Sequence, residues 1–199
     1  MRKKVVFQNK WCYCEHIFDS DENISLIQNF EAKENGIGLE MYLKLSAAKD
    51  EISQNMRTYL VKSKETDELI GYFSLKAGMV TYNEKFFKKG FESLPAIELA
   101  NFAVNEKFNK DLLYEFEESI GNMMFVDFIL PIVKKATVHI GASVLYIFSL
   151  PYGKLMKHYT KMGFMRLPQW VERKVHKRIK PNYDKNCIFM YQMINSDII

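Results

Sequence analysis

The pattern of hydrophobic and polar residues predicts helices in the first part of the chain. Apolar residues recur near helical spacing over residues 21–35 and again over residues 39–53, and the sequence NGIG interrupts the pattern between them. We therefore expect two helices there, preceded by a short strand.

A β-hairpin is predicted next. Residues 56–63 and 69–78 are rich in β-branched and aromatic side chains, and the polar sequence KETDE separates them. Both strands are expected to be at least half buried. Residues 81–95 then form a predicted loop, and residues 96–105 a predicted central strand.

The second half of the chain predicts a long helix followed by a buried strand. Apolar residues between positions 119 and 141 follow a helical period. Pro131 should bend that helix or shift its hydrogen bonds, because proline has no N–H group. Residues 143–151 are continuously apolar, as in a strand buried on both faces.

A short amphipathic helix over residues 152–162, closed by Gly163, and a last strand over residues 186–194 complete the order. This order predicts an α/β fold with a mixed sheet, antiparallel at first and then continued by a right-handed strand-helix-strand crossover. A chain of 199 residues that is 48% hydrophobic can bury a core. Because internal repeats and Pro/Gly-rich linkers are absent from the sequence, we expect residues 1–199 to form a single domain.

Neither a membrane span nor a metal site is expected. The apolar stretch over residues 123–133 is short and contains Asp127 and a proline, and the basic N-terminus precedes only three apolar residues, so it is not a signal peptide. Cys12, Cys14 and Cys187 lack the paired spacing of structural zinc sites and are interpreted as free thiols. We therefore expect a cytoplasmic protein without a bound metal ion.

The net charge of +4 is unevenly distributed. Residues 172–180 are basic, whereas residues 111–119 are acidic. Such asymmetry indicates an anionic substrate or partner, although a charged run is also typical of a solvated loop. The same two interpretations hold for residues 166–180 with Trp170 and Tyr183 nearby: a grip on RNA phosphates and bases, or a mobile loop.

The sequence HYTKMGF at residues 158–164 looks like FYEKLGF, a common ending in the GCN5-related N-acetyltransferase (GNAT) superfamily. With the order of elements, it makes residues 56–194 resemble that superfamily. The resemblance implies the GNAT fold, with a central mixed, mostly antiparallel sheet of six to seven strands flanked by helices. Residues 47–61 and 71–75 also look like the acetyltransferase toxins of bacterial toxin–antitoxin pairs, which acetylate the amino group of aminoacyl-tRNA.

The resemblance implies acetyl-coenzyme A (acetyl-CoA) as the acetyl donor. The main chain of Phe102, Ala103 and Val104 would pair with its pantetheine arm. The turn that follows would hold its pyrophosphate through backbone N–H groups at a helix start. The residues of this chain that match the turn and the helix start are Ser119, Ile120, Gly121, Asn122 and Met123.

This turn departs from the family pattern. Phe116 stands where the family has a basic residue, Ser119 replaces its first glycine, and Glu117 and Glu118 would lie near a dianionic group. Either backbone N–H groups still bind the phosphates, or the loop has lapsed and the chain is a non-catalytic GNAT-fold binding module. The glutamates are equally explained by a favourable interaction with a helix N-terminus.

Tyr159 resembles the family's general acid, which protonates the departing thiolate of coenzyme A. A phenol with its ordinary pKa of about 10 stays protonated at neutral pH. The alternative is a half-buried aromatic residue that anchors the helix to the sheet. Glu98 resembles the glutamate base of the histone-acetylating branch, or else it is an exposed or salt-bridged side chain. His158 and His139 are weaker candidates for the base.

The expected function is acetyl-CoA-dependent N-acetyltransfer to a primary amine, by direct attack in a ternary complex. One alternative is the non-catalytic binding module. The other is a toxin-like enzyme that acts on aminoacyl-tRNA and has an antitoxin-like protein as its partner. The acceptor, whether a small molecule or a macromolecule, and the oligomeric state are left open, and no membrane partner is expected.

Overall fold

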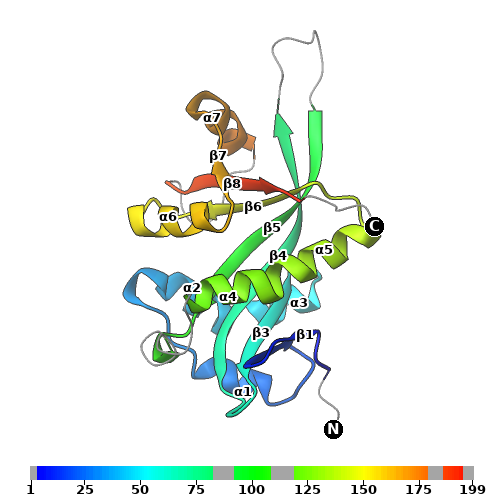
Figure 1. Cartoon of the computed structure of the whole chain (residues 1–199), viewed down its shortest axis with the longest axis vertical. Coiled ribbons are helices and arrows are strands. Elements are labelled where there is room, and N and C mark those ends of the chain that lie inside the picture. Colours follow the sequence, from blue (N-terminus) through cyan, green and yellow to red (C-terminus); the bar gives the residue numbers. More distant parts are fainter. Residues whose placement is uncertain (1–3, 83–91, 109–118, 179–185, 195–199) are drawn as a thin grey trace. The chain divides into compact units, whose positions relative to one another are not determined.

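The computed structural model describes residues 4–82, 92–108, 119–178 and 186–194 (Figure 1). The chain divides into two compact units: the first contains Met1–Lys76 and Ala100–Ile132, and the second contains Ala77–Leu99 and Val133–Ile199. Each unit is built from two separate stretches of sequence, because strands β4 (Leu69–Tyr82) and β5 (Glu92–Val104) both contribute residues to both units.

In the first unit, neighbouring strands are antiparallel. Strand β1 (Phe7–Gln8) pairs with β2 (Cys12–His16), β2 pairs with β3 (Arg57–Ser63), and β3 pairs with β4. The helical elements of this unit are α1 (Asn23–Gln28), the 3-10 turn η1 (Glu34–Gly36), α2 (Ile37–Leu45), α3 (Ala47–Ile52), the 3-10 turn η2 (Glu106–Phe108), α4 (Ile120–Met124) and the π-helical turn η4 (Phe125–Ile129). The π-helical turn continues directly into α5 (Leu130–His139).

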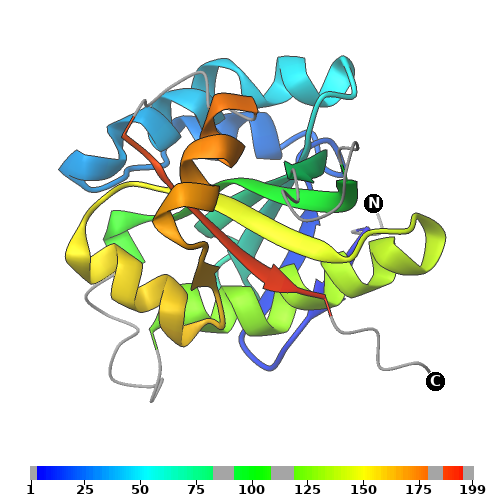
Figure 2. The same cartoon turned by 90° about the horizontal axis from the view of Figure 1, so that it is seen from above.

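In the second unit, β6 (Val144–Ser149) is parallel to β5 and antiparallel to β8 (Ile188–Met193). Figure 2 shows β6, in yellow, beside β8, in red. Strand β7 (Met165–Arg166) pairs antiparallel with β8, and the helices that belong to this unit alone are α6 (Gly153–Lys161) and α7 (Gln169–Arg178).

The hydrogen-bonded strand order is β1-β2-β3-β4-β5-β6-β8-β7. The predicted α/β class, with a mixed and mostly antiparallel sheet flanked by helices, is confirmed. The sheet has eight strands rather than the expected six to seven. The added strands are short: β1 and β7 contain two residues each.

Several local predictions are confirmed. The hairpin strands are β3 and β4, and all six residues of β6 are buried, as expected for a strand covered on both faces. Gly163 follows α6 with φ 91°, a left-handed conformation that glycine adopts without steric cost. Pro131 comes just after the π-helical turn, so the hydrogen-bond pattern of the long helix shifts where proline removes a donor.

The N-terminal region differs from the predicted pair of helices. Helix α1 ends at Gln28, and residues 29–33 are not helical. Helix α2 begins at Ile37, inside the NGIG sequence, and a further break falls at Ser46, between α2 and α3. The Ser46 N–H donates to the Tyr42 carbonyl at 2.9 Å, and the Ser46 carbonyl accepts from the Asp50 N–H at 3.0 Å. Helical spacing therefore continues across the break, which is why the apolar periodicity does not reveal it.

The loop interpretation of the basic segment is wrong over Gln169–Arg178, which form helix α7. The Pro168 carbonyl accepts from the N–H groups of Val171 and Glu172, and Val175 is completely buried in the second unit. Strand β5 also begins within the predicted loop, at Glu92. The helix is stabilised by burial of apolar side chains such as Val175 against the rest of the unit. The run of basic residues in the sequence does not indicate this burial.

Each unit has its own hydrophobic core. The core of the first unit contains Ile17, Ile27, Phe30, Leu43, Ala47, Leu60, Leu69 and Tyr72. The core of the second unit contains Val80, Ala96, Val144, Tyr146, Phe148, Val175, Cys187 and Phe189. Within the described stretches, every helix is too short or too polar to traverse a lipid bilayer.

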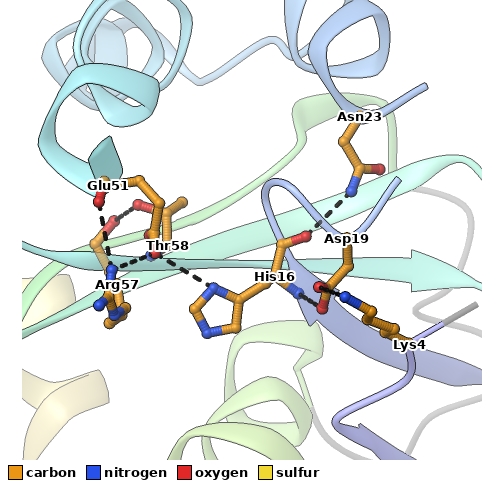
Figure 3. A network of polar contacts seen from close by, with 8 residues as sticks. Lys4, His16, Asp19, Asn23, Glu51, Arg57 and Thr58 are labelled. Carbon is orange, nitrogen blue, oxygen red and sulfur yellow. Dashed lines mark hydrogen bonds and ion pairs between the residues drawn. The ribbon is translucent and has the colours of Figure 1, made fainter. Parts of the chain in front are cut away.

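Glu51 ties α3 to the strands of the first unit (Figure 3). Its buried carboxylate accepts from Arg57 Nη1 at 2.7 Å and from the Thr58 N–H at 2.8 Å. His16 Nδ1 lies 3.5 Å from the same carboxylate, and its ring packs against Tyr59 with 4.5 Å between the ring centroids. Residues of β2, β3 and α3 thus share one buried acidic group.

A second buried acidic group joins β2 to β3. Lys62 Nζ lies 2.5 Å from Glu15 Oε1, and the two side chains are 3% and 0% exposed. Glu15 Oε2 is buried without a hydrogen-bond partner. The lysine is therefore the charge that offsets the desolvation of this carboxylate.

We predict that Lys62→Met lowers the free energy of unfolding by about 3–5 kcal/mol, because it leaves Glu15 as an unpaired buried charge. The double variant Glu15→Leu/Lys62→Met removes both charges and should recover most of the loss. Denaturant unfolding measures both effects. The exposed neighbour Lys64 provides the control: Lys64→Met should change stability by less than about 0.5 kcal/mol. Equal stability of Lys62→Met and the parent protein would contradict this account.

Candidate active site

Gly71 of β4 is the point in the first unit where the predicted donor-binding elements meet. A Cβ atom at this position would lie 2.7 Å from the Ala103 carbonyl oxygen of β5 and 2.7 Å from Met124 Sδ of α4. These distances are too short for a side-chain carbon, so glycine leaves room for both neighbours. The strand expected to pair with pantetheine and the helix expected to bind the pyrophosphate are therefore brought together.

Asn105 holds the end of β5 against β4. Its N–H donates to the Ile70 carbonyl at 2.8 Å, and its Nδ2 donates to the Leu69 carbonyl at 3.0 Å. The three preceding residues, Phe102, Ala103 and Val104, are half-buried. Their position is fixed through the backbone, which is also the part of the strand that pantetheine contacts would use.

Ser119, which the sequence resemblance matches to the family's first glycine, is the N-cap of α4. Its Oγ accepts from the Asn122 N–H at 3.3 Å, and its carbonyl accepts from the N–H groups of Asn122 and Met123 at 2.8 and 3.1 Å. Within the described part of the chain, the N–H groups of Ile120 and Gly121 have no acceptor. The first turn thus offers these two donors to a phosphate.

Three of the residues that make this turn atypical, Phe116, Glu117 and Glu118, lie outside the described residues. The described part shows how the serine acts. Its Oγ is a second and longer acceptor for the Asn122 N–H, which the Ser119 carbonyl already accepts, so the side chain stabilises the helix start without taking a further donor from a ligand.

Tyr159 lies on α6 in the second unit and is 9% exposed. Its ring meets Phe164 edge-on, with 5.8 Å between the ring centroids, and the Phe164 N–H donates to the Tyr159 carbonyl at 3.0 Å. Among the described residues, none forms a hydrogen bond with the Tyr159 hydroxyl. The tyrosine therefore packs as an anchor through its ring.

Burial raises the pKa of Tyr159 to about 12, because the phenolate would be poorly solvated. At neutral pH the side chain is a neutral hydrogen-bond donor. A thiol has a pKa of about 8.5, so its thiolate is a weaker base than this phenolate. Tyr159 is consequently suited to donate a strong hydrogen bond to a thiolate, and complete transfer of its proton is energetically uphill in the free protein.

The two histidines named as weaker candidates differ in environment. Burial, and secondarily the charge of Lys161, lowers the pKa of His158, so this residue is neutral at pH 7. His139 is exposed at the end of α5.

Glu98 of β5 lies opposite Tyr146 of β6 in the parallel register. Tyr146 Oη donates to Glu98 Oε2 at 3.1 Å, and the Glu98 side chain is half-buried. The glutamate is thus a hydrogen-bonded carboxylate with partial access to water. The described contacts do not join Glu98 to Tyr159, although both belong to the second unit.

The sequence pattern did not single out Tyr146. It lies in the apolar stretch VLYIFS, where a tyrosine is an ordinary core residue, and its partner is 48 positions away. Gly71 lies in residues 71–75, whose resemblance to acetyltransferase toxins assigns the glycine no structural role.

The basic helix α7 presents few free charges among its described side chains. Arg166, just before it, is paired with the buried Glu172 at 2.8 Å. Trp170 is 61% exposed, as a stacking platform for a nucleic-acid base would be. Tyr183 lies outside the described residues.

The three cysteines are buried thiols without disulfide bonds. Burial, followed by the charge of Asp127, raises the pKa of Cys12 to about 11, so its thiol is protonated and unreactive. In the stretches that the structure describes, no group of three or more His, Cys, Asp or Glu side chains is arranged to hold a metal ion.

No protein-family model and no curated protein sequence matches the chain. Several solved structures are similar to the chain. A tyrosine-to-phenylalanine mutant of KacT is 19% identical with a TM-score of 0.65, and the match covers 93% of this chain and 96% of KacT. A similar mutant of the AtaT toxin, bound to the C-terminus of the antitoxin AtaR and to acetyl-CoA, is 16% identical with a TM-score of 0.62 over 92% of this chain and 93% of AtaT.

AtaT complexed with acetyl-methionyl-tRNAfMet is 15% identical, with a TM-score of 0.58 over 89% of this chain and 93% of AtaT. KacT and AtaT are toxin acetyltransferases of the GNAT family. The protein has the GNAT fold of these toxins, and the fold implied by the sequence resemblance is confirmed.

We predict that Gly71→Ala destabilises the protein by more than about 1 kcal/mol, because the new methyl group collides with the Ala103 carbonyl. It should also weaken acetyl-CoA binding by displacing β5 or α4. Thermal unfolding with and without acetyl-CoA measures both effects. Gly38, inside α2, is the matched control, because nothing lies within 4 Å of a Cβ there. Gly38→Ala should be neutral or stabilising by up to about 1 kcal/mol. Equal behaviour of the two variants would contradict the role of Gly71.

Proposed function

We propose that the protein is an acetyl-CoA-dependent N-acetyltransferase that transfers the acetyl group to a primary amine by direct attack in a ternary complex. The observation that carries the proposal is the convergence at Gly71 of the Ala103 main chain and the helix that follows Ser119. This convergence occurs on the fold of AtaT, a protein solved with acetyl-CoA.

On the donor side, the main chain of Phe102, Ala103 and Val104 would pair with the pantetheine arm, and the Val104 N–H or a neighbour would polarise the thioester carbonyl. Residues 119–123 would hold the pyrophosphate. The free N–H groups of Ile120 and Gly121 and the partial positive charge of a helix start supply this interaction without a basic side chain.

In the chemical step, the amine nitrogen attacks the thioester carbon, and the carbon–sulfur bond breaks as the amide bond forms. Tyr159 would donate a hydrogen bond to the sulfur as negative charge develops there. Its raised pKa makes this donor persistent over the whole physiological pH range. The proton lost by the acceptor ammonium would pass to Glu98, directly or through water.

The alternative, a GNAT-fold module that no longer binds acetyl-CoA, is favoured by one observation. The Asn122 N–H, which a helix start can offer to a ligand, is instead bonded to the Ser119 carbonyl and Oγ, so the first turn has one donor fewer for a phosphate. Direct measurement of acetyl-CoA binding separates the two functions.

We predict that calorimetry detects acetyl-CoA binding by the parent protein. Tyr159→Phe should retain that affinity and lower turnover by about tenfold or more, because the hydroxyl acts on charge that develops only in the transition state. Tyr152→Phe, also at α6 but with an exposed side chain, is the control and should keep full turnover. The absence of binding at millimolar acetyl-CoA would support the binding module, whereas full turnover of Tyr159→Phe would remove Tyr159 from the mechanism.

We further propose aminoacyl-tRNA as the acceptor and an antitoxin-like protein as the partner of a single-domain, cytoplasmic enzyme. AtaT has been solved with acetyl-methionyl-tRNAfMet and with the C-terminus of its antitoxin AtaR. In this chain, the exposed Trp170 and the basic sequence of α7 support an RNA acceptor. A charged tRNA offers the free α-amino group that the chemistry requires.

Expression in a bacterial host is expected to arrest growth, and Tyr159→Phe should abolish the arrest. With purified protein, an aminoacyl-tRNA should be acetylated at least about tenfold faster than the free amino acid, because RNA contacts add binding energy that the small acceptor lacks. Trp170→Ala should reduce the tRNA rate and leave the free amino acid rate unchanged. Harmless expression of folded protein, or equal rates with both acceptors, would contradict the tRNA assignment but not the acetyltransferase assignment.

A further inference from the structure

Tyr146 is a tightly enclosed polar side chain next to a candidate catalytic group. It is 2% exposed in the centre of β6, and its hydroxyl donates to Glu98 Oε2 at 3.1 Å. The parallel register places the two residues directly opposite each other, so their pairing follows from the sheet itself.

The ring of Tyr146 is held by aromatic neighbours of the second unit. Its centroid lies 5.5 Å from that of Phe189 and 5.9 Å from that of Phe148, the latter in an edge-on arrangement. Both phenylalanines are buried. Such packing restricts the ring to one orientation, and this orientation fixes the direction in which the hydroxyl points.

Gly78 of β4 provides the space for the hydroxyl. A Cβ atom at this position would lie 2.4 Å from Tyr146 Oη and 2.9 Å from Cε1 of the same ring. Any larger residue would push the phenol away from its place beside Glu98. Three strands, β4, β5 and β6, therefore contribute one residue each to a Gly78–Tyr146–Glu98 arrangement.

We propose that Tyr146 is a positioning residue for the acetyl transfer: it orients the Glu98 carboxylate and keeps it deprotonated, so that Glu98 accepts the proton of the acceptor ammonium at neutral pH. This inference rests on the proposed function, in which Glu98 is the base. Tyr146 itself neither contacts the acceptor nor exchanges its proton.

The physical reason is the cost of a half-buried charge. A carboxylate that loses part of its hydration tends to hold a proton and is then useless as a base. A hydrogen bond donated by a phenol stabilises the anionic form and offsets that tendency. Among the strands whose register with β5 or β6 is described, β6 places Tyr146 opposite Glu98, and β8 places Tyr191 opposite Tyr146, one strand farther from the glutamate.

The test is Tyr146→Phe, with two independent readouts. In carbon-13 NMR of the free protein, the titration midpoint of the Glu98 carboxyl should rise by about 1 pH unit, the shift expected when a hydrogen bond to a charged group is lost. The acid limb of kcat/KM should move to higher pH by the same amount, while acetyl-CoA affinity is unchanged. In a Glu98→Gln background, Tyr146→Phe should cause no further loss of turnover.

Tyr191→Phe is the matched control, since it makes the same substitution at the register partner of Tyr146 and leaves the bond to Glu98 intact. It should move neither readout. Gly78→Ala keeps the phenol but displaces it, and it should reproduce both shifts. Thermal unfolding verifies that each variant is folded.

An unchanged Glu98 midpoint in folded Tyr146→Phe overturns the inference, and so does a pH-independent loss of kcat, which a purely structural residue would cause. A shifted midpoint in a protein that acetylates no amine overturns the positioning role together with the proposed function. A shifted midpoint with an unshifted acid limb in an active enzyme overturns the positioning role alone, and the proposed function survives.

Discussion

The close approach at Gly71 is the constraint on which the donor half of the proposed site depends. The Ala103 carbonyl oxygen of β5 and the Met124 sulfur of α4 occupy the space that a side chain at position 71 would need. The end of β5 and helix α4 can therefore lie this close to β4 only because residue 71 has no Cβ atom. Asn105 reinforces the arrangement by fastening the end of β5 to Leu69 and Ile70, the two residues just before Gly71.

Tyr159 and Glu98, the two groups proposed to donate and to accept protons, lie in different environments. Tyr159 packs against the Phe164 ring, and burial alone raises its pKa and keeps its proton in place. Glu98 is only half-buried and receives a hydrogen bond. In the proposed mechanism, the first environment would favour a protonated donor and the second a deprotonated acceptor, which is the separation of roles that acid–base chemistry at neutral pH needs.

Features set by neighbours along the chain were predictable from the sequence, and features set by distant contacts were not. The uniform burial of β6, the left-handed Gly163 and the disturbed helix before Pro131 each follow from a few adjacent residues. Helix α7 was missed because its stability comes from burial of Val175 rather than from local propensity. Likewise, the Tyr146–Glu98 bond joins residues 48 positions apart, a contact that no spacing rule encodes. The resemblance to acetyltransferases indicated which residues deserved attention, but not how they are held.

The passage of β4 and β5 through both units has a consequence for how the protein is made. Because each unit combines two separated stretches, a ribosome supplies parts of both before it finishes either. The first unit has all its residues once Ile132 has been synthesised, whereas the second still lacks β6, α6 and β8. In a nascent chain, the parts of β4 and β5 that belong to the second unit therefore precede their partners from β6 and β8, and no single cut in the gene separates the units into independent fragments.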